Sequence, residues 1–317
     1  MATDARPIFV IGAPRSGTTL LRVMLSSHSR IYIPPESDFI PRLFLRHPHR
    51  PMSPAKAQEN MQIILENHRF FREWREDPIE PAAFVARLPD LAPATFLSAL
   101  YRDYAAQYGA VRWGDKSPIY THHVGLLADI FPEGQFVNLI RDGRDAALSS
   151  LAAYPDRFYV DIYFAARSWR WRVQASREAG AALGPQRYME IRYEALTQEP
   201  ERVLRAVCGF LGEAYEPAMS QPQDLGRELL RPGGRHAPVR EPVHPNSERW
   251  RSEMPAADQR LFQAVAGDLL LNLGFEVPDL GAMSPRERIR FAGLSSKYSV
   301  IEGGRRVLQA VGIFPPH

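Results

Sequence analysis

The sequence predicts an α/β fold, in which a parallel β-sheet is flanked by helices and a helical insertion acts as a lid. Two observations lead to this fold class. Short apolar, β-branched runs precede segments of helical periodicity, at 8–11 before 16–27 and at 135–140 before a helix from about 146. A glycine-containing loop joins the first run to its helix. A further strand is expected at 187–192. Because alternating strands and helices form parallel sheets, these repeated units indicate a parallel sheet covered by helices.

The composition is that of a single globular domain over 1–317. Hydrophobic residues make up 45% and charged residues 24% of the chain, which is ordinary for a globular protein. The helix-rich segment 41–108 is the expected insertion over the strand ends, and the proline-rich segment 217–255 is expected to be an irregular ordered loop. An amphipathic helix is expected at 255–273. The basic tail 284–317 is expected to present a solvated face.

Charge and cysteine content restrict the class of protein. The 39 basic and 36 acidic residues give a formal net charge of +3, which is too balanced to indicate a nucleic-acid binder. The single cysteine, Cys208, excludes an internal disulfide and fits a reducing compartment. No apolar run approaches a membrane-spanning length, and the nine histidines show no metal-ligand spacing. We therefore expect a soluble, cytoplasmic protein with no membrane, nucleic-acid or metal partner.

The first loop has the spacing of a phosphate-binding P-loop. Residues 9–25 read FVIGAPRSGTTLLRVML, with a glycine, four residues, Gly17 and two hydroxyls. A strand-loop-helix unit of this type directs backbone N–H groups and a helix dipole toward one anion. Arg15 adds a cation, and Ser16, Thr18 and Thr19 add neutral donors. Thr18 stands where a nucleotide triphosphatase has lysine, so the γ-phosphate clamp is missing. A tight turn before a helix is the alternative interpretation.

A second arginine and serine follow the strand at 135–140. Arg141 ends this strand, and Ser149 lies about two helical turns into the next helix, so both can reach a second anion beside the first loop. Arg144 is expected to turn outward or to pair with Asp142 or Asp145. Taken alone, this stretch is more often a salt-bridged turn than a ligand site. After a phosphate loop, it indicates a ligand with two separated phosphate groups.

These motifs together resemble the sulfotransferase superfamily, which uses 3′-phosphoadenosine 5′-phosphosulfate (PAPS). The closer resemblance is to the tyrosylprotein sulfotransferase branch. It covers roughly residues 7 to 215 and weakens in the insertion. The segments that carry it, in order, are RSGTTLLRVMLSSH, PPESDFIPRLF, GDKSP, LIRDGRDAALSS and IRYEAL.

The resemblance implies a P-loop-type sheet and a role for individual residues. The 5′-phosphosulfate would be held by Arg15, Ser16, Gly17, Thr18 and Thr19. The 3′-phosphate would be bound by Arg141 and Ser149, and Tyr193 would lie near the adenosine. Glu36 would be the base that activates the acceptor, and Lys116 would lie beside the bridging oxygen.

The chemistry of sulfuryl transfer asks for the same groups. It needs a cation where charge develops on the leaving phosphate and a base where the acceptor loses its proton. Lys116 and Arg15 can supply the cation, and Glu36 can supply the base. Each also has a structural interpretation: Glu36 could begin the helix that continues at 39–40, and Lys116 could be a turn lysine paired with Asp115.

Two departures from the branch bear on the acceptor. Asp38 stands where the branch has a basic residue directed toward acidic peptides, although Arg42 matches another basic position. The C-terminal catalytic serine of the branch has no counterpart around 233–236. A small hydroxyl or amine compound is therefore at least as well supported as a peptide acceptor. The oligomeric state stays open, with a homodimer among the alternatives.

Three functions are consistent with these residues. The first is a PAPS-dependent sulfotransferase. The second is a P-loop kinase with a displaced lysine, for which Lys116 is the nearby candidate. The third is a nucleotide-binding module without catalysis.

Overall fold

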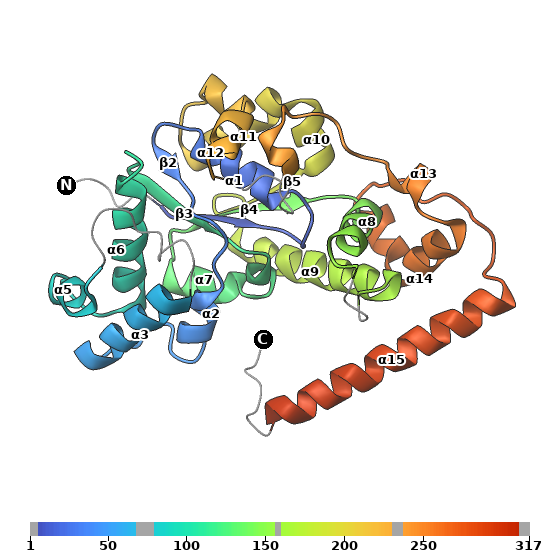
Figure 1. Cartoon of the computed structure of the whole chain (residues 1–317), viewed down its shortest axis with the longest axis horizontal. Helices are drawn as coiled ribbons and strands as arrows, with labels where there is room; N and C mark the ends of the chain where they lie inside the picture. Colours follow the sequence, from blue (N-terminus) through green and yellow to red (C-terminus); the bar gives the residue numbers. More distant parts are fainter. Residues whose placement is uncertain (1–5, 68–78, 156–159, 230–236, 311–317) are drawn as a thin grey trace.

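The computed structural model describes residues 6–67, 79–155, 160–229 and 237–310 and contains a five-stranded parallel sheet between layers of helices (Figure 1). The strand order is β2-β3-β1-β4-β5, and every neighbouring pair is parallel. The strands are β1 (Ile8–Ile11), β2 (Ile31–Tyr32), β3 (Arg112–Lys116), β4 (Gln135–Ile140) and β5 (Tyr188–Arg192). This architecture confirms the predicted α/β fold class, and the strands expected at 8–11 and 135–140 have the expected bounds.

The alternation of side chains along β1 divides the core between the two faces of the sheet. Ile8 and Val10 pack in one cluster with α1 (Thr18–Ser26) and α11 (Pro200–Leu211), whereas Phe9 and Ile11 pack in another with α6 (Pro93–Ala106) and α7 (Val124–Ile130). All four side chains are fully buried. Because a strand alternates its side chains, a continuous apolar run is the pattern of a strand covered on both faces. Figure 1 shows α1, α10 and α11 on one side of the sheet and α7 and α9 on the other.

Helices follow the strands along most of the chain. In the N-terminal half they are α1 (Thr18–Ser26), α2 (Phe39–Phe44), α3 (Pro54–Asn67), α5 (Pro81–Ala86), α6 (Pro93–Ala106), the 3-10 helix η1 (Pro118–His122) and α7 (Val124–Ile130). After β4 they include α8 (Gly143–Ala153), α9 (Ile162–Leu183), α10 (Tyr193–Gln198), α11 (Pro200–Leu211), α14 (Ala256–Asn272) and α15 (Pro285–Ala310). Helix α8 begins three residues earlier than expected, because Asp142 caps it by accepting a hydrogen bond from the amide of Arg144.

The described part of the insertion, 41–67 and 79–108, packs beside the sheet. Its helix α6 contacts β3, where Tyr101 stacks on Trp113 with ring centroids 4.8 Å apart. Both side chains are buried in the cluster that also contains Phe9. The insertion therefore extends the core on this side, and residues 68–78 lie outside the described part.

The proline-rich segment 217–255 is more helical than predicted. It contains the 3-10 helices η2 (Pro217–Ser220) and η3 (Ala237–Arg240) and the α-helices α12 (Gln223–Leu229) and α13 (Trp250–Glu253). Pro217 is the first residue of η2, and the carbonyl of Pro222 accepts the amide of Gly226 in α12. Prolines at these positions start helices because their missing N–H has no helical partner there. The expectation of a loop without helix was therefore wrong, and 230–236 lie outside the described residues.

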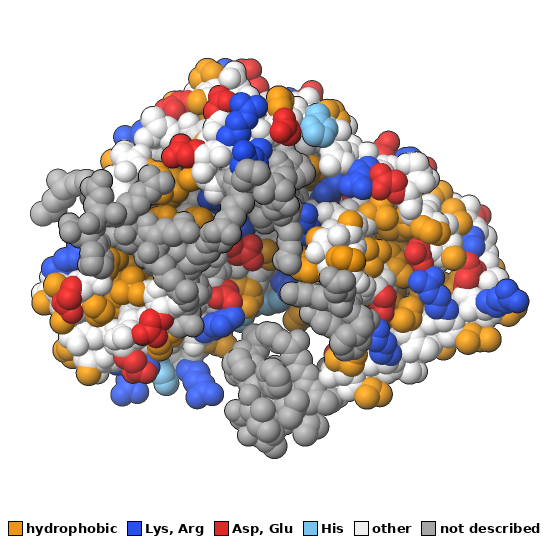
Figure 2. Space-filling model, in the orientation of Figure 1, with side chains coloured by type: hydrophobic (Ala, Val, Ile, Leu, Met, Phe, Trp, Pro, Cys, Tyr) orange, Lys and Arg blue, Asp and Glu red, His pale blue; other side chains and the backbone are white. Residues whose placement is uncertain are grey.

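The C-terminal region also folds as a helix, where only a solvated basic face was expected. Helix α15 contacts α9 and α14. Tyr298 is buried against Tyr163, and its hydroxyl donates to the Asp161 carboxylate at 2.9 Å. The basic composition of this segment gives no indication that Tyr298 packs against Tyr163 of α9. The face in Figure 2 shows acidic and basic side chains interspersed. The overall charge of this face therefore does not indicate a ligand site, and the cations of a site are identified from individual side chains.

Candidate active site

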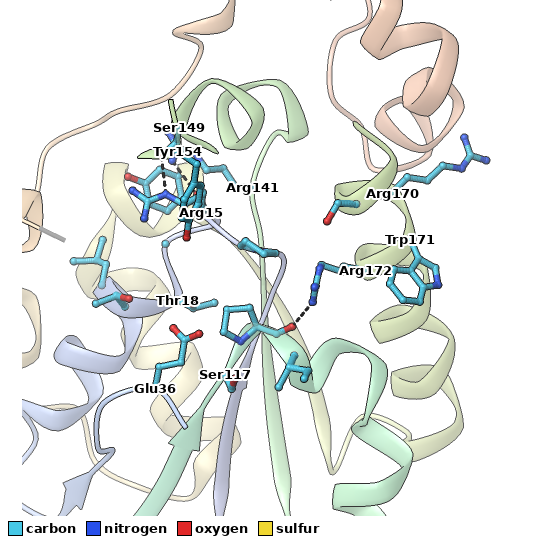
Figure 3. Close-up of a pocket in the computed structure, with 18 of the residues that line it drawn as sticks. Arg15, Thr18, Glu36, Ser117, Arg141, Ser149, Tyr154, Arg170, Trp171 and Arg172 are labelled. Atoms are coloured by element: carbon cyan, nitrogen blue, oxygen red, sulfur yellow. Dashed lines mark hydrogen bonds between the residues drawn. The ribbon is translucent and has the colours of Figure 1, made fainter. Parts of the chain in front are cut away.

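One cavity of about 1490 Å³ opens where the loops after β1, β3, β4 and β5 meet (Figure 3). The carboxyl ends of parallel strands lie at one edge of a sheet, which is where ligands bind in open α/β folds. Of the residues predicted for the site, those that line the cavity are Arg15, Gly17, Thr18, Thr19, Glu36, Arg141, Ser149 and Tyr193. Ser16 and Lys116 are buried and do not line it. No described helix is long and apolar enough to cross a membrane.

The loop between β1 and α1 has a conformation that requires a glycine. Gly17 has φ 93°, and a Cβ at this position would lie 2.4 Å from the ring of Tyr193. Arg15 adopts φ 68°, an uncommon left-handed conformation for a residue with a side chain. No side chain caps the N-terminus of α1. Its first amides are therefore available to an anion in the cavity.

The two predicted anion-binding segments meet at this loop. Arg15 Nε donates to Ser149 Oγ at 3.0 Å, and Arg141 Nη1 donates to the Arg15 carbonyl at 3.2 Å. The Arg141 guanidinium lies 4.3 Å from the centroid of the Tyr193 ring. Its Nη2 donates to the carbonyl of Asn246 at 2.8 Å, which joins the loop after η3 to the cavity. Arg15 is thus held in one cluster with Arg141 and Ser149, which lie 126 and 134 positions further along the chain.

Two buried polar atoms in this cluster lack a hydrogen-bond partner within the described part of the chain. They are Ser16 Oγ and Arg141 Nε. Buried donors normally have partners, because an unsatisfied donor costs about 1–3 kcal/mol. Together with Arg15 and the uncapped amides of α1, these donors fit a ligand with phosphate groups.

The candidate base and the candidate cation form an ion pair. Lys116 Nζ donates to Glu36 Oε2 at 2.9 Å, and the Glu36 side chain is 49% exposed whereas that of Lys116 is 3% exposed. Burial lowers the pKa of Lys116, and the charge of Glu36 partly opposes this shift. Lys116 ends strand β3 and does not lie in a turn, and Glu36 precedes helix α2, which begins at Phe39. The two structural interpretations of these residues were therefore wrong.

A buried carboxylate holds the segments that carry this ion pair. Asp115 Oδ2 accepts hydrogen bonds from Ser37 Oγ at 2.7 Å and from the hydroxyls of Tyr101 and Tyr120. Its Oδ1 accepts the amide of Lys116 at 2.7 Å. Burial raises the pKa of Asp115, and these hydrogen bonds oppose the rise. Since Ser37 follows Glu36 and Asp115 precedes Lys116 in the chain, this network fixes where Glu36 and Lys116 meet.

Other charged residues near the site have structural partners. Arg144 is buried, pairs with Asp142 at 2.7 Å and stacks on Trp250, so the prediction that it pairs with Asp142 is confirmed and an outward orientation is wrong. Asp38 lines the cavity and accepts a hydrogen bond from Arg42. Asp38, which differs from the tyrosylprotein sulfotransferase branch, therefore offsets the charge of Arg42, which matches a basic position of that branch.

Sequence reasoning missed one wall of the cavity, which is formed by α9 and η1. The sequence 161–177 is typical of an amphipathic core helix that contains Tyr163, Trp169 and Trp171, and Tyr163 and Trp169 are indeed buried in α9. Trp171, however, lines the cavity, is 54% exposed and stacks on His122 at 3.6 Å. The spacing of two between Trp169 and Trp171 places them on different sides of a helix, and this was the available signal.

Known proteins resemble the chain as follows. A profile described as the sulfotransferase family matches residues 7–217, more than half of the chain. The chain is 24% identical over 235 residues to protein-tyrosine sulfotransferase 2 of Gallus gallus, covering 72% of this chain and 56% of that protein. It is 27% identical over 343 residues to nodulation protein NoeE of Sinorhizobium fredii, covering 98% of this chain and 75% of that protein.

The solved structures resemble the chain in fold. The sulfotransferase domain of the Synechococcus PCC 7002 olefin synthase superposes with a TM-score of 0.56 at 25% identity, covering 86% of this chain and 96% of that domain. The length of the match varies among curated relatives, and the chain spans 30%, 56% and 39% of three of them.

Proposed function

The chain belongs to the sulfotransferase family, and from this premise we propose that it transfers a sulfuryl group from PAPS to a hydroxyl or amine acceptor. The observation that carries the proposal is the cluster of Arg15, Arg141 and Ser149 around the loop before α1. This cluster offers two arginines and unsatisfied buried donors to a ligand with two phosphate groups. The cavity is larger than a typical site for one small ligand, about 300–1,000 Å³, so a nucleotide and an acceptor can be accommodated together.

We assign the nucleotide contacts by the chemistry of the donors. The 5′-phosphosulfate would lie at the loop and the first turn of α1, held by Arg15, Ser16, Gly17, Thr18 and Thr19. Arg141 and Ser149 would bind the 3′-phosphate. The ring of Tyr193, on which Arg141 already stacks, would lie against the adenosine.

When bound, PAPS supplies a sulfur that bonds to the acceptor oxygen or nitrogen while its bond to the 5′-phosphate oxygen breaks, the electron pair remaining on that phosphate. Glu36 lines the cavity and would take the acceptor proton. Lys116 and Arg15 would offset the negative charge that develops on the leaving phosphate. As Glu36 is protonated, its attraction for Lys116 weakens, which frees the lysine charge for the phosphate.

The loop itself favours this reaction over phosphoryl transfer from ATP. A kinase of the P-loop type needs a lysine in this loop that reaches the β- and γ-phosphates. Thr18 occupies that position and lines the cavity. The pairing of Asp38 with Arg42 favours a small acceptor over a strongly acidic peptide, because it offsets a cation that such a peptide would use.

Product formation tests the proposed function. The purified protein is incubated with PAPS and a panel of phenols, sugars, amines and tyrosine peptides, and sulfated products are detected by mass spectrometry. We expect a product that depends on PAPS and is lost in E36Q. Phosphorylated product from ATP and Mg²⁺, with none from PAPS, would support the kinase instead. Retained binding of 3′,5′-adenosine bisphosphate (PAP), the nucleotide product left by PAPS, without any sulfated product would support the non-catalytic module.

A further inference from the structure

Helix α9 carries four arginines, of which three pair with carboxylates. These pairs are Arg167 with Glu302 (2.8 Å), Arg170 with Asp268 (2.7 Å) and Arg177 with Glu190 (3.1 Å). Arg172 differs from them, because no carboxylate within the described ranges lies at ion-pair distance from it. Arg167, Arg170 and Arg172 all line the cavity, so the pairing with carboxylates is what distinguishes Arg172. Its charge is therefore available to a ligand in a way that the other three charges are not.

The guanidinium of Arg172 is held in a fixed orientation by neutral groups. Its Nη1 donates to the carbonyl of Pro118 at 2.7 Å and to Thr121 Oγ1 at 3.3 Å (Figure 3). Its Nε is buried and has no hydrogen-bond partner among the described residues. A planar guanidinium oriented in this way can offer further donors to an oxyanion without losing much rotational freedom.

Burial makes this cation costly to leave without a counter-charge. It lowers the pKa of Arg172 to about 10, and the charge of Glu36 opposes the shift. The side chain therefore remains protonated at neutral pH. Glu36 is the acidic group that acts on it, but that carboxylate is already paired with Lys116 at 2.9 Å. A ligand anion would offset the desolvation of Arg172 more fully than any carboxylate of the described chain does.

The position of Arg172 connects it with the acceptor. Arg15, Arg141 and Ser149 cluster together, whereas Arg172 extends from α9 on another side of the cavity (Figure 3). Glu36 and Ser117 lie below both groups in the view and line the same cavity as Arg172. An acceptor whose reacting group meets Glu36 can therefore extend toward Arg172 while the nucleotide occupies the P-loop.

We propose that Arg172 determines acceptor specificity by binding an oxyanion group, such as a carboxylate, on a small acceptor whose reacting hydroxyl or amine lies at Glu36. This inference rests on the proposed function and narrows the class of acceptor. One buried guanidinium selects a single anionic group, which differs from recognition of a strongly acidic peptide by several exposed cations.

Matched acceptor pairs test the proposal. The probes are 3-(4-hydroxyphenyl)propanoate against its carboxamide, and glucuronate against glucose, each assayed with PAPS. We expect the carboxylate member of a pair to have a kcat/KM about 10- to 100-fold higher, the range for a charge-assisted hydrogen bond in a buried site. The preference should fall to about equality in R172Q, mainly through KM. R172K, which keeps the charge but loses the fork, should retain part of it.

The control is R177Q, which removes another arginine of α9 whose partner is Glu190 and which does not line the cavity. R177Q should keep the wild-type preference. Equal activity on both members of every pair, or a preference that survives in R172Q, would overturn the inference. Thermal unfolding of R172Q and R172K separates loss of binding from loss of folding, and R172K keeps the comparison informative if R172Q does not fold.

Binding measurements separate this inference from the proposed function. If the wild type sulfates no member of the panel, calorimetry on the PAP-saturated protein should still show tighter binding of the carboxylate member, and equal affinities would overturn the role of Arg172. Weakened binding of PAP itself in R172Q would show that Arg172 serves the nucleotide instead. Failure of the wild type to bind PAP would overturn the proposed function and the inference with it.

Discussion

Replacing Gly17 with alanine should damage the nucleotide site more than it damages the fold. The substitution has two costs. Alanine at φ 93° pays a left-handed backbone penalty of roughly 1–2 kcal/mol. Its Cβ would also lie 2.4 Å from the Tyr193 ring, where ordinary contact begins at 3.4 Å, so the ring must move by about 1.0 Å, the difference between the two. Tyr193 supports the guanidinium of Arg141, so this movement should disturb the proposed 3′-phosphate contact.

Gly212 provides a matched control for the backbone penalty. It has φ 78°, and a Cβ there would meet nothing within 4 Å. G212A should therefore lose roughly 1–2 kcal/mol of unfolding free energy, as G17A does from its backbone, without disturbing the site.

The assay is calorimetric titration with PAP, combined with thermal unfolding. We expect G17A to bind PAP at least about 10-fold more weakly than wild type, a loss of about 1.4 kcal/mol. G212A should bind PAP normally. At a PAP concentration of 100 times the wild-type Kd, ligand stabilisation should fall from about 2.7 kcal/mol in the wild type to about 1.4 kcal/mol in G17A. Equal PAP affinity in G17A and G212A would refute the reasoning.

Three further substitutions test the residues around the ion pair. E36Q should lower kcat by about 10²- to 10⁴-fold because the base is lost, whereas its affinity for PAP should stay within a few fold of wild type. Rapid-quench assays measure kcat, and an unchanged kcat would rule out Glu36 as the base. Burial lowers the pKa of Lys116, so activity that needs this cation should be full below that pKa and lost as pH rises through it. In a pH profile of kcat with a sugar acceptor, K116R should move the alkaline limb to higher pH, and an unmoved limb would assign it to another group. D115N should lower the unfolding free energy by about 1–3 kcal/mol and also lower kcat, because asparagine keeps only one of the two carboxylate oxygens that accept hydrogen bonds from Ser37 and Lys116. Urea unfolding beside D129N, at an exposed position, is the check, and equal effects of both substitutions would contradict the network.

The parts of the fold that could be predicted from sequence depend on local periodicity. Strands β1 and β4 are apolar runs buried on both faces, so the pattern alone locates them. The end of β3 could not be recognised in this way, because Gly114, Asp115 and Lys116 have the composition of a turn. Their polar groups are satisfied by Ser37, Tyr101 and Glu36, which are distant in sequence, and only the tertiary structure reveals these partners.

Some residues of the candidate site could likewise be predicted from local sequence, whereas others could not. Arg15, Arg141 and Ser149 follow strands at fixed spacings, and the topology of a parallel sheet brings such residues together. Arg172 belongs to a helix rich in arginine and tryptophan, where periodicity indicates only a packed face. Its distinction from Arg167, Arg170 and Arg177 depends on which arginines meet a carboxylate across the fold. That information is absent from the local sequence.

The most direct test of the central claim is the nucleotide preference of the loop, measured by calorimetry on the full chain. The account predicts that PAP binds without Mg²⁺ and at least about 10-fold more tightly than 5′-AMP, which lacks the 3′-phosphate assigned to Arg141 and Ser149. Tighter binding of ATP with Mg²⁺ than of PAP, or equal binding of PAP and 5′-AMP, would contradict it.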